Sequence, residues 1–172
     1  MKIRKANLND THSCVRLIEL AMDGIIQTLG LNQNALERLF SQSAENSRLS
    51  HEHISVVETG SEVVAAMGCY DGATQGQMDA KSGIKFQKEC FSGELYIDFI
   101  ATFKNQRKKG YASALLKSAD EIARAKNLSK IALIVKQDKI KNIKFYESLG
   151  FKKDDKILAY GFSFLHMIKE IR

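Results

Sequence analysis

Apolar positions recur with a helical period in several stretches of the chain. The clearest stripe falls at positions i, i+3, i+4, i+7, i+10 and i+11 of one segment and consists of Ala112, Leu115, Leu116, Ala119, Ile122 and Ala123. Another stripe begins at Val15, shortly after Asn9 and Asp10, whose side-chain oxygens can cap the first turn of a helix. The pattern predicts helices over both segments, and two more over 33–44 and 140–149.

Other stretches have the apolar character of β-strands. Residues 53–58 and 62–70 are predicted to form a hairpin, because Thr59-Gly60-Ser61 between them are turn-forming residues. The near-continuous apolar run 131–135 suits a strand that is buried on both faces. Further strands are expected over 2–6, 94–102 and 164–171. The order of these strands and helices predicts a mixed α/β fold.

The whole chain, residues 1–172, is expected to form a single domain. A chain of 172 residues can bury about two-thirds of its unfolded surface in one core. Neither an internal repeat nor an interdomain linker interrupts the pattern. The segment 71–93 departs from it, with glycines spread among polar residues. We predict a loop insertion there, and connections of this length are often functional or mobile.

Charge and composition narrow the class of protein. The net charge is +6, and the basic excess is mostly lysine, with 19 Lys against 7 Arg. Since arginine is the preferred residue for reading bases and phosphates, this excess is weak evidence for nucleic-acid binding, and that function ranks last. No apolar run approaches the roughly 20 residues of a membrane span, and the N-terminus lacks the apolar core of a signal peptide. We therefore expect a cytoplasmic protein without membrane contact.

The cysteines and histidines do not predict a metal site. Cys14, Cys69 and Cys90 are far apart and odd in number, so neither a disulfide framework nor a zinc site is expected. His51 and His53 could lie on one strand face, but no third ligand follows at metal-binding spacing. The expected chemistry therefore involves no metal.

The segment with the clearest chemical character runs from residue 97 to residue 116 and joins an apolar strand to the most strongly patterned helix. Free backbone amides at a helix N-terminus bind phosphate, and Gly110 allows the backbone to approach an anion closely. The basic side chains around this point are Lys104, Arg107, Lys108, Lys109 and Lys117. Because basic residues suit the end of a helix better than its start, they indicate an anionic partner. The segment predicts a phosphate or pyrophosphate site, although Walker A and three-glycine dinucleotide motifs are absent.

Arg107-x-x-Gly110-x-Ala112 matches the pattern Arg/Gln-x-x-Gly-x-Gly/Ala, and through it the sequence resembles the GNAT superfamily of acetyl-CoA-dependent N-acetyltransferases. The strand at 97–102 stands where that family has its central splayed strand. Residues 145–151, FYESLGF, are similar to the family's Phe-Tyr-x-x-x-Gly-Phe segment. The resemblance implies the GNAT fold, an α/β fold with a mixed central sheet of about 6–7 strands, splayed central strands and about four flanking helices.

The resemblance implies that acetyl-CoA is the cosubstrate. Backbone groups of the strand residues Ile100, Ala101 and Thr102 would hold the pantetheine arm, as an added strand does at a sheet edge. The pyrophosphate would lie on backbone amides and basic side chains of Arg107, Lys108, Lys109, Gly110, Tyr111 and Ala112. Tyr146 would protonate the leaving thiolate or hydrogen-bond it; alternatively, it is a core aromatic residue.

Two positions depart from the family pattern. Lys104 stands where family members often carry proline after the strand. Lys139 stands where an asparagine is common, seven residues before Tyr146. The second change removes one amide contact to the cofactor, although a lysine could reach a phosphate instead. Neither change abolishes the expected chemistry.

The implied reaction is direct attack of a neutral primary amine on the acetyl thioester in a ternary complex. A base must remove the amine's proton. Asp98 is the first candidate because it is a carboxylate on the central strand, with Glu94 and Tyr96 as alternatives; equally, Asp98 could pair with a lysine or cap a neighbouring group. The acceptor is expected to be a small-molecule or peptide amine. A cationic acceptor would suit the acidic residues expected near the site, which are Asp71, Asp79, Glu89, Glu94 and Asp98.

A second function stays open at this point. The chain could be a non-catalytic CoA-binding module with the same fold, serving as a regulator or partner subunit. It would then bind CoA without turnover on any amine. Homodimers are frequent in the resembling family, so a homodimer is a further expectation that no feature of this sequence tests.

Overall fold

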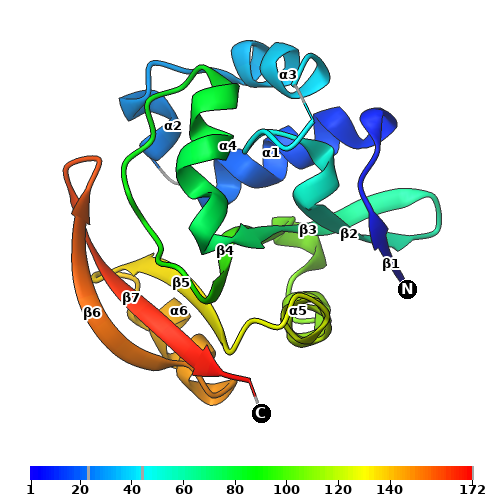
Figure 1. Ribbon diagram of the computed structural model, residues 1–172. Helices are drawn as coiled ribbons and strands as arrows, with labels where there is room; N and C mark the ends of the chain where they lie inside the picture. Colours follow the sequence, from blue (N-terminus) through cyan, green and yellow to red (C-terminus); the bar gives the residue numbers. More distant parts are fainter. Residues whose placement is uncertain (23, 44, 172) are drawn as a thin grey trace.

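The computed structural model describes residues 1–22, 24–43 and 45–171. In this part of the chain, one seven-stranded sheet runs through the molecule (Figure 1). Its strands are β1 (Lys2–Lys5), β2 (Ile54–Thr59), β3 (Glu62–Asp71), β4 (Glu94–Thr102), β5 (Lys130–Lys136), β6 (Lys152–Ala159) and β7 (Phe162–Glu170). They lie in the order β1-β2-β3-β4-β5-β7-β6, and neighbours are antiparallel except for β4 and β5, which are parallel. The predicted mixed α/β fold is confirmed.

Helices cover both faces of this sheet (Figure 1). The first four lie on one face and are α1 (Thr11–Ala21), α2 (Ile25–Thr28), α3 (Gln33–Ser41) and α4 (Gln75–Ser82). The opposite face carries α5 (Tyr111–Ala125) and α6 (Ile140–Ser148). The helix expected over 33–44 ends at Ser41, and Ala44 lies outside the described residues. The described residues form six α-helices where the resemblance implies about four; α2 and α4 are among the short ones.

Two apolar layers hold the helices on the sheet. On one face, Leu115 and Ala119 from the predicted stripe of α5 are fully buried against Leu95 and Ile97 of β4 and their neighbours. On the other face, α1 and α3 pack on the sheet through a second cluster that includes Val15, Ile18, Leu36, Phe40 and Phe99. The strand β4 is therefore buried from both sides, which matches its apolar sequence.

The parallel strands β4 and β5 pair over only part of their length. Their register joins Glu94–Ile97 to Lys130–Leu133 and then stops. Beyond this point β4 continues to Thr102 beside β3, whereas β5 continues to Lys136 beside β7. Among the described residues, one edge of β4 is thus left without a strand partner from Asp98 onward. This separation is the splay that the sequence led us to expect.

The start of α1 differs from the predicted cap. Asn7, not Asn9 or Asp10, has the capping side chain, which accepts from the Asn9 amide ahead of a short 3-10 turn. The Asp10 carboxylate reaches back to the Asn7 amide and to the guanidinium of Arg4, at 2.6 Å. Asp10 therefore closes a reciprocal capping box at this entry and does not cap α1 itself.

Besides α2, the strand β6 and the helix α4 were not predicted. The strand β6 begins Lys-Lys-Asp-Asp-Lys, is largely exposed and pairs only with β7 at the sheet edge, so it lacks the apolar alternation that identifies a strand. The segment 71–93 is not one loop, because it contains α4. That helix buries only Gln75 and Met78 and is followed by Gly83 in the left-handed region, with φ +70°.

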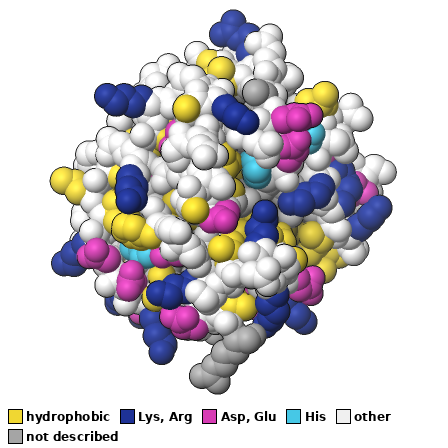
Figure 2. Space-filling model, viewed as in Figure 1, with side chains coloured by type: hydrophobic (Ala, Val, Ile, Leu, Met, Phe, Trp, Pro, Cys, Tyr) yellow, Lys and Arg dark blue, Asp and Glu magenta, His cyan; other side chains and the backbone are white. Residues whose placement is uncertain are grey.

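The surface combines both signs of charge. On the face shown in Figure 2, Lys and Arg side chains are spread among acidic and uncharged ones instead of forming one continuous patch. Within residues 1–22, 24–43 and 45–171, no helix is both long and apolar enough to cross a membrane.

Candidate active site

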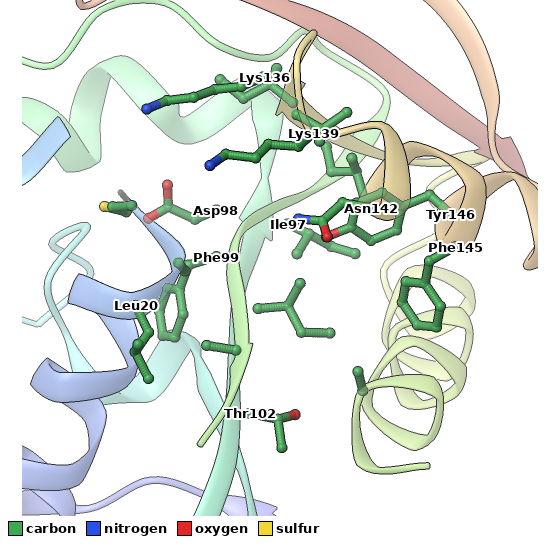
Figure 3. A pocket seen from close by; sticks show the side chains of 18 of the residues that line it. Leu20, Ile97, Asp98, Phe99, Thr102, Lys136, Lys139, Asn142, Phe145 and Tyr146 are labelled. Atoms are coloured by element: carbon green, nitrogen blue, oxygen red, sulfur yellow. The ribbon is translucent and has the colours of Figure 1, made fainter. Parts of the chain in front are cut away.

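A cavity of about 760 Å³ lies where β4 and β5 separate. Its wall includes the unpaired part of β4, the start of α5, one face of α6 and the end of β5. All of the sequence-predicted cofactor-binding residues border this cavity; they are Ile100, Ala101, Thr102, Arg107, Lys108, Lys109, Gly110, Tyr111, Ala112 and Lys139. The two predicted catalytic residues, Asp98 and Tyr146, border it as well (Figure 3). The structure therefore brings together residues that are up to 48 positions apart in the sequence, from Asp98 to Tyr146.

A β-bulge shapes β4 at the mouth of this cavity. In the pairing with β3, Gly68 is opposite Phe99 and Cys69 is opposite Ile97, so Asp98 is the extra residue. The bulge turns two consecutive side chains, Asp98 and Phe99, to the α1 side of β4, while Ile97 lies on the α6 side (Figure 3). An acidic group thereby enters the cavity from a strand that is mostly apolar.

The turn before α5 has the backbone conformation of an anion site. Gly110 precedes the first residue of the helix with φ +81°, and Lys108 also has a positive φ of +64°. Within the part of the chain that the structure describes, no side chain caps this end of α5, and its first turn carries no acidic residue. The orphan amides of a helix start, together with left-handed residues in the preceding turn, form a concave set of N–H donors. The predicted phosphate segment thus has a geometry that fits a phosphate group.

Two of the basic side chains at this turn have neutral partners. The Arg107 Nε donates to the Thr102 carbonyl oxygen at 3.4 Å, and the Lys109 Nζ donates to the Gln106 amide oxygen at 2.7 Å. Neither of these contacts neutralises a positive charge. Lys139 precedes α6 and lies at the Asp98 end of the cavity, whereas Thr102 lies at the other end (Figure 3).

Tyr146 extends from α6 toward β4 (Figure 3). Its ring contacts the rings of Phe145 and Phe151, with centroids 5.5 and 5.8 Å away. Burial raises the pKa of Tyr146 to about 12, so the hydroxyl stays protonated at neutral pH and is available as a donor. Asn142, one turn earlier on α6, also borders the cavity. Sequence reasoning did not identify Asn142.

The most prominent polar group that sequence reasoning missed is Arg48. It lies in the polar segment between α3 and β2, yet its side chain is only 1% exposed. The guanidinium binds both Asp98 oxygens, with Nη2–Oδ1 at 2.6 Å and Nε–Oδ2 at 3.2 Å. It also donates to Glu89 at 2.5 Å and to Asp79 at 3.4 Å. Burial opposes the charge, but the carboxylates of Asp98 and Glu89 raise the pKa of Arg48, which therefore remains a cation.

Aromatic side chains enclose this ion cluster. The Arg48 guanidinium lies 4.0 Å from the ring centroid of Phe86, a cation–π distance. The hydroxyl of Tyr96 donates to Glu89 at 2.9 Å, and the hydroxyl of Tyr160 donates to the other oxygen of the same carboxylate. Burial raises the pKa of Glu89, and the nearby Arg48 opposes that rise. Phe86 and Glu89 both come from the segment 71–93, which therefore contributes part of the cavity wall.

The remaining acidic candidates lie elsewhere. Glu94 is not part of the cavity wall; its carboxylate contacts the ring of His166 at 3.3 Å and accepts from the Phe91 amide. Asp71 caps a short 3-10 turn before α4. Of the five acidic residues expected near the site, three gather at Arg48, namely Asp79, Glu89 and Asp98. The proposed role of Asp98 as a base remains a prediction, and its partner is an arginine, not a lysine.

The described part of the chain contains no cluster of side chains suited to bind a metal ion. No group of three or more His, Cys, Asp and Glu side chains there is arranged to hold a metal ion. The cysteines Cys14, Cys69 and Cys90 are buried free thiols.

Comparison with known proteins connects this geometry to a family. Residues 24–151 match the model of the Acetyltransferase (GNAT) family. A solved acetyltransferase structure shares 23% sequence identity with the chain, and all of both chains superpose with a TM-score of 0.84. An N-acetyltransferase from Staphylococcus aureus Mu50 also shares 23% identity, with 98% of this chain and 100% of that chain covered and a TM-score of 0.84.

A third structure contains a ligand. The PaiA N-acetyltransferase from Thermoplasma acidophilum, solved in complex with coenzyme A, has 13% identity, a TM-score of 0.64 and 98% coverage of both chains. At these identities the structural likeness shows the fold alone. No protein of curated function matches the sequence.

Proposed function

The chain belongs to the acetyltransferase (GNAT) family, and from that premise we propose that it transfers the acetyl group of acetyl-CoA to a primary amine within a ternary complex. The observation that carries this proposal is the shape of one cavity. The unpaired edge of β4 and the start of α5 both border this cavity. The start of α5 follows two residues in the left-handed region, Lys108 and Gly110. A strand edge and an anion site in line match a cosubstrate that has an amide-containing arm and a pyrophosphate.

The residues around the cavity fit acetyl-CoA. In the proposed complex, backbone groups of Ile100 and Thr102 bind the pantetheine amides as an added strand would. The amides from Lys108 to Ala112 bind the pyrophosphate, which the dipole of α5 also stabilises. Arg107, whose guanidinium lies beside Thr102, adds positive charge. No acidic residue in the first turn of α5 opposes this binding.

The proposed chemistry places the thioester near Tyr146. The amine nitrogen attacks the acetyl carbonyl carbon, the carbon–sulfur bond breaks, and the Tyr146 hydroxyl gives its proton to the departing thiolate. A pKa of about 12 keeps this hydroxyl protonated until the thiolate forms. A backbone amide near Ile100–Thr102 would stabilise the negative oxygen of the tetrahedral intermediate. Asp98 remains the sequence-based candidate for the base.

Isothermal titration with acetyl-CoA and with CoA tests the binding half of this proposal. We expect micromolar affinity for the wild type and its loss in the double variant Arg107→Glu/Gly110→Asp, which places negative charge at the proposed pyrophosphate site. Lys152→Glu on the exposed strand β6 reverses a charge outside the cavity and should bind normally. If folded wild-type protein, freed of copurified CoA, binds neither ligand, the proposal fails.

An amine panel tests the transfer half. Release of the CoA thiol on addition of small-molecule and peptide amines, followed by mass spectrometry of the acetylated product, would support an N-acetyltransferase. Cosubstrate binding without turnover on any amine would instead support a CoA-binding module of the same fold.

A further inference from the structure

Three carboxylates share one guanidinium beside the cavity. Asp79, Glu89 and Asp98 all contact Arg48, and their side chains are 15%, 5% and 8% exposed. The cation can balance only one of these charges, and burial penalises those that are left. A cluster of this composition takes up a proton more readily than an isolated carboxylate does. Because the groups titrate together, the proton belongs first to the cluster.

The contacts of each carboxylate single out one proton acceptor. Asp98 has both oxygens on the Arg48 guanidinium, so neither oxygen is left for a substrate proton. Asp79 does not border the cavity and is bound to Gln75 as well as to Arg48. Glu89 borders the cavity and uses only Oε2 for Arg48. Its Oε1 accepts a hydrogen bond from the Tyr160 hydroxyl.

An independent feature of the backbone points to the same carboxylate. Tyr160 and Gly161 form the two-residue turn between β6 and β7, with φ values of +53° and +75°. Such turns favour asparagine and glycine, and a tyrosine in the left-handed region is strained. In this conformation the Tyr160 hydroxyl donates to Glu89 and accepts from the Gln87 amide at 3.0 Å. A strained residue that binds a buried carboxylate at a cavity wall is characteristic of a functional site.

We propose that Glu89 is the general base of the acetyl transfer and that Arg48 and Tyr160 are the residues that position it. This inference rests on the proposed function and replaces Asp98 in the role of base. A substrate ammonium has three protons. One passes to Oε1 of Glu89 and then to solvent, the second ends on the CoA sulfur by way of Tyr146, and the third stays on the amide product. The acetyl carbon gains the bond to nitrogen as it loses the bond to sulfur.

The surroundings of Glu89 suit this role. Burial raises the pKa of its carboxyl, which brings a glutamate closer to neutral pH, where a base is most effective. The charged and titratable groups that act on this carboxyl are Arg48 from the segment before β2, Tyr96 and Asp98 from β4, and Tyr160 from the β6–β7 turn. Asp79 from α4 contacts the same guanidinium, and Lys136 and Lys139 border the same cavity. Arg48 and the two phenols act against the pKa rise, whereas Asp98 adds to it.

Kinetics of Glu89→Gln test the assignment. For the wild type, kcat/KM should fall at acid pH as the Glu89 carboxyl becomes protonated. In Glu89→Gln we expect this limb to vanish and kcat to drop by about 10²- to 10⁴-fold, the usual contribution of a general base. Measuring the pH profile with two amines of different basicity distinguishes the limb caused by Glu89 from the limb caused by the amine. The pKa of the amine differs between the two acceptors, whereas the pKa of Glu89 is the same with both. Glu121→Gln, an exposed position on α5, should behave like the wild type.

The pH profile of Tyr160→Phe is a second test. If Tyr160 had only a structural role, this substitution would not shift the acid limb. Loss of a hydrogen bond to the Glu89 carboxylate raises the carboxyl's pKa, so the acid limb should shift to higher pH while the protein stays folded. The proposal is overturned if Glu89→Gln keeps the acid limb and its kcat. It is also overturned if only KM for the amine rises, since Glu89 would then bind the charge of the acceptor without taking its proton.

A direct titration separates this inference from the proposed function. Carbon-13 NMR of the glutamate carboxyls, without any substrate, should show one resonance that is absent from Glu89→Gln and titrates above the usual value of about 4.3. Titration at or below that value overturns the inference whatever the activity. If the carboxyl titrates high but the wild type acetylates no amine, the proposed function fails, and the proton-binding cluster stands without a catalytic role.

Discussion

The ring of Phe99 lies directly over Gly68 on the neighbouring strand. A Cβ atom built at residue 68 would come within 2.5 Å of the Phe99 Cε1 atom, closer than side-chain carbons pack. These two residues are paired across β3 and β4 at the bulge that turns Asp98 into the cavity. The absence of a side chain at residue 68 therefore allows Phe99 and Asp98 to share one side of β4.

Gly68→Ala should disturb both stability and cosubstrate binding. The methyl group must displace the Phe99 ring, and overpacking of this kind destabilises by about 1–3 kcal/mol. The displaced ring shifts the unpaired edge of β4, so the affinity for acetyl-CoA should fall as well. Urea denaturation and isothermal titration measure the two effects.

Gly76→Ala is the matched control. Gly76 lies in α4 with no atom within 4 Å of the added Cβ and without a positive φ, so alanine should leave stability unchanged or raise it by about 0.5–1 kcal/mol. An equal loss of stability in both variants would contradict the role assigned to the contact between Phe99 and Gly68.

Tyr146→Phe should separate catalysis from binding. Removal of the hydroxyl leaves the ring in its contacts with Phe145 and Phe151, so the fold and the affinity for acetyl-CoA should be retained. The thiolate then leaves without its proton donor, and we expect kcat to fall by about 10²- to 10⁴-fold. Steady-state kinetics beside a titration of acetyl-CoA check this; an unchanged kcat would assign Tyr146 to the core alone.

Helices and strands with a clear apolar period could be predicted from the sequence. Elements that form only by pairing with a neighbouring strand could not. The stripe of α5 and the apolar run of β5 lie where the sequence placed them, because burial on one face or on both leaves a periodic signature. The exposed strand β6 buries only its last residue and leaves no such signature. It forms because β7 offers an edge for pairing.

The same distinction holds for the site: one part could be predicted from the sequence and the other could not. The phosphate segment is local in sequence, and its Gly110 and basic residues identify it directly. The ion cluster depends on contacts between residues far apart, since Arg48 meets Asp98 across 50 positions and Glu89 across 41. A lone arginine in a polar segment gives no sign of burial. The φ of +53° at Tyr160 is likewise set by the β6–β7 hairpin and not by the residue type.

Arg48→Met should be among the most damaging single substitutions. It leaves Asp79, Glu89 and Asp98 together at a mostly buried site without their cation, and breaking a buried ion pair on one side costs about 3–5 kcal/mol. The deficit should shrink as the pH is lowered, because protonation removes the unbalanced charges. Arg38→Met on the exposed side of α3 is the control. Equal urea midpoints for the two variants at neutral pH would contradict the structural role of Arg48.

His166 should make stability depend on pH in the opposite direction from a paired carboxylate. The ring is fully buried, with Nε2 3.3 Å from Glu94 and Nδ1 3.0 Å from Asp154. Burial by itself lowers the pKa of His166, but the hydrogen bonds and charges of both carboxylates outweigh it, and the folded pKa is raised above 6.5. The protonated ring therefore contributes its full stabilisation below the unfolded pKa of about 6.5. That contribution is lost as the pH rises through the folded value. Urea unfolding of wild type and His166→Gln should show the larger difference at pH 6 and a smaller one at pH 9; a difference that grows with pH would contradict this assignment.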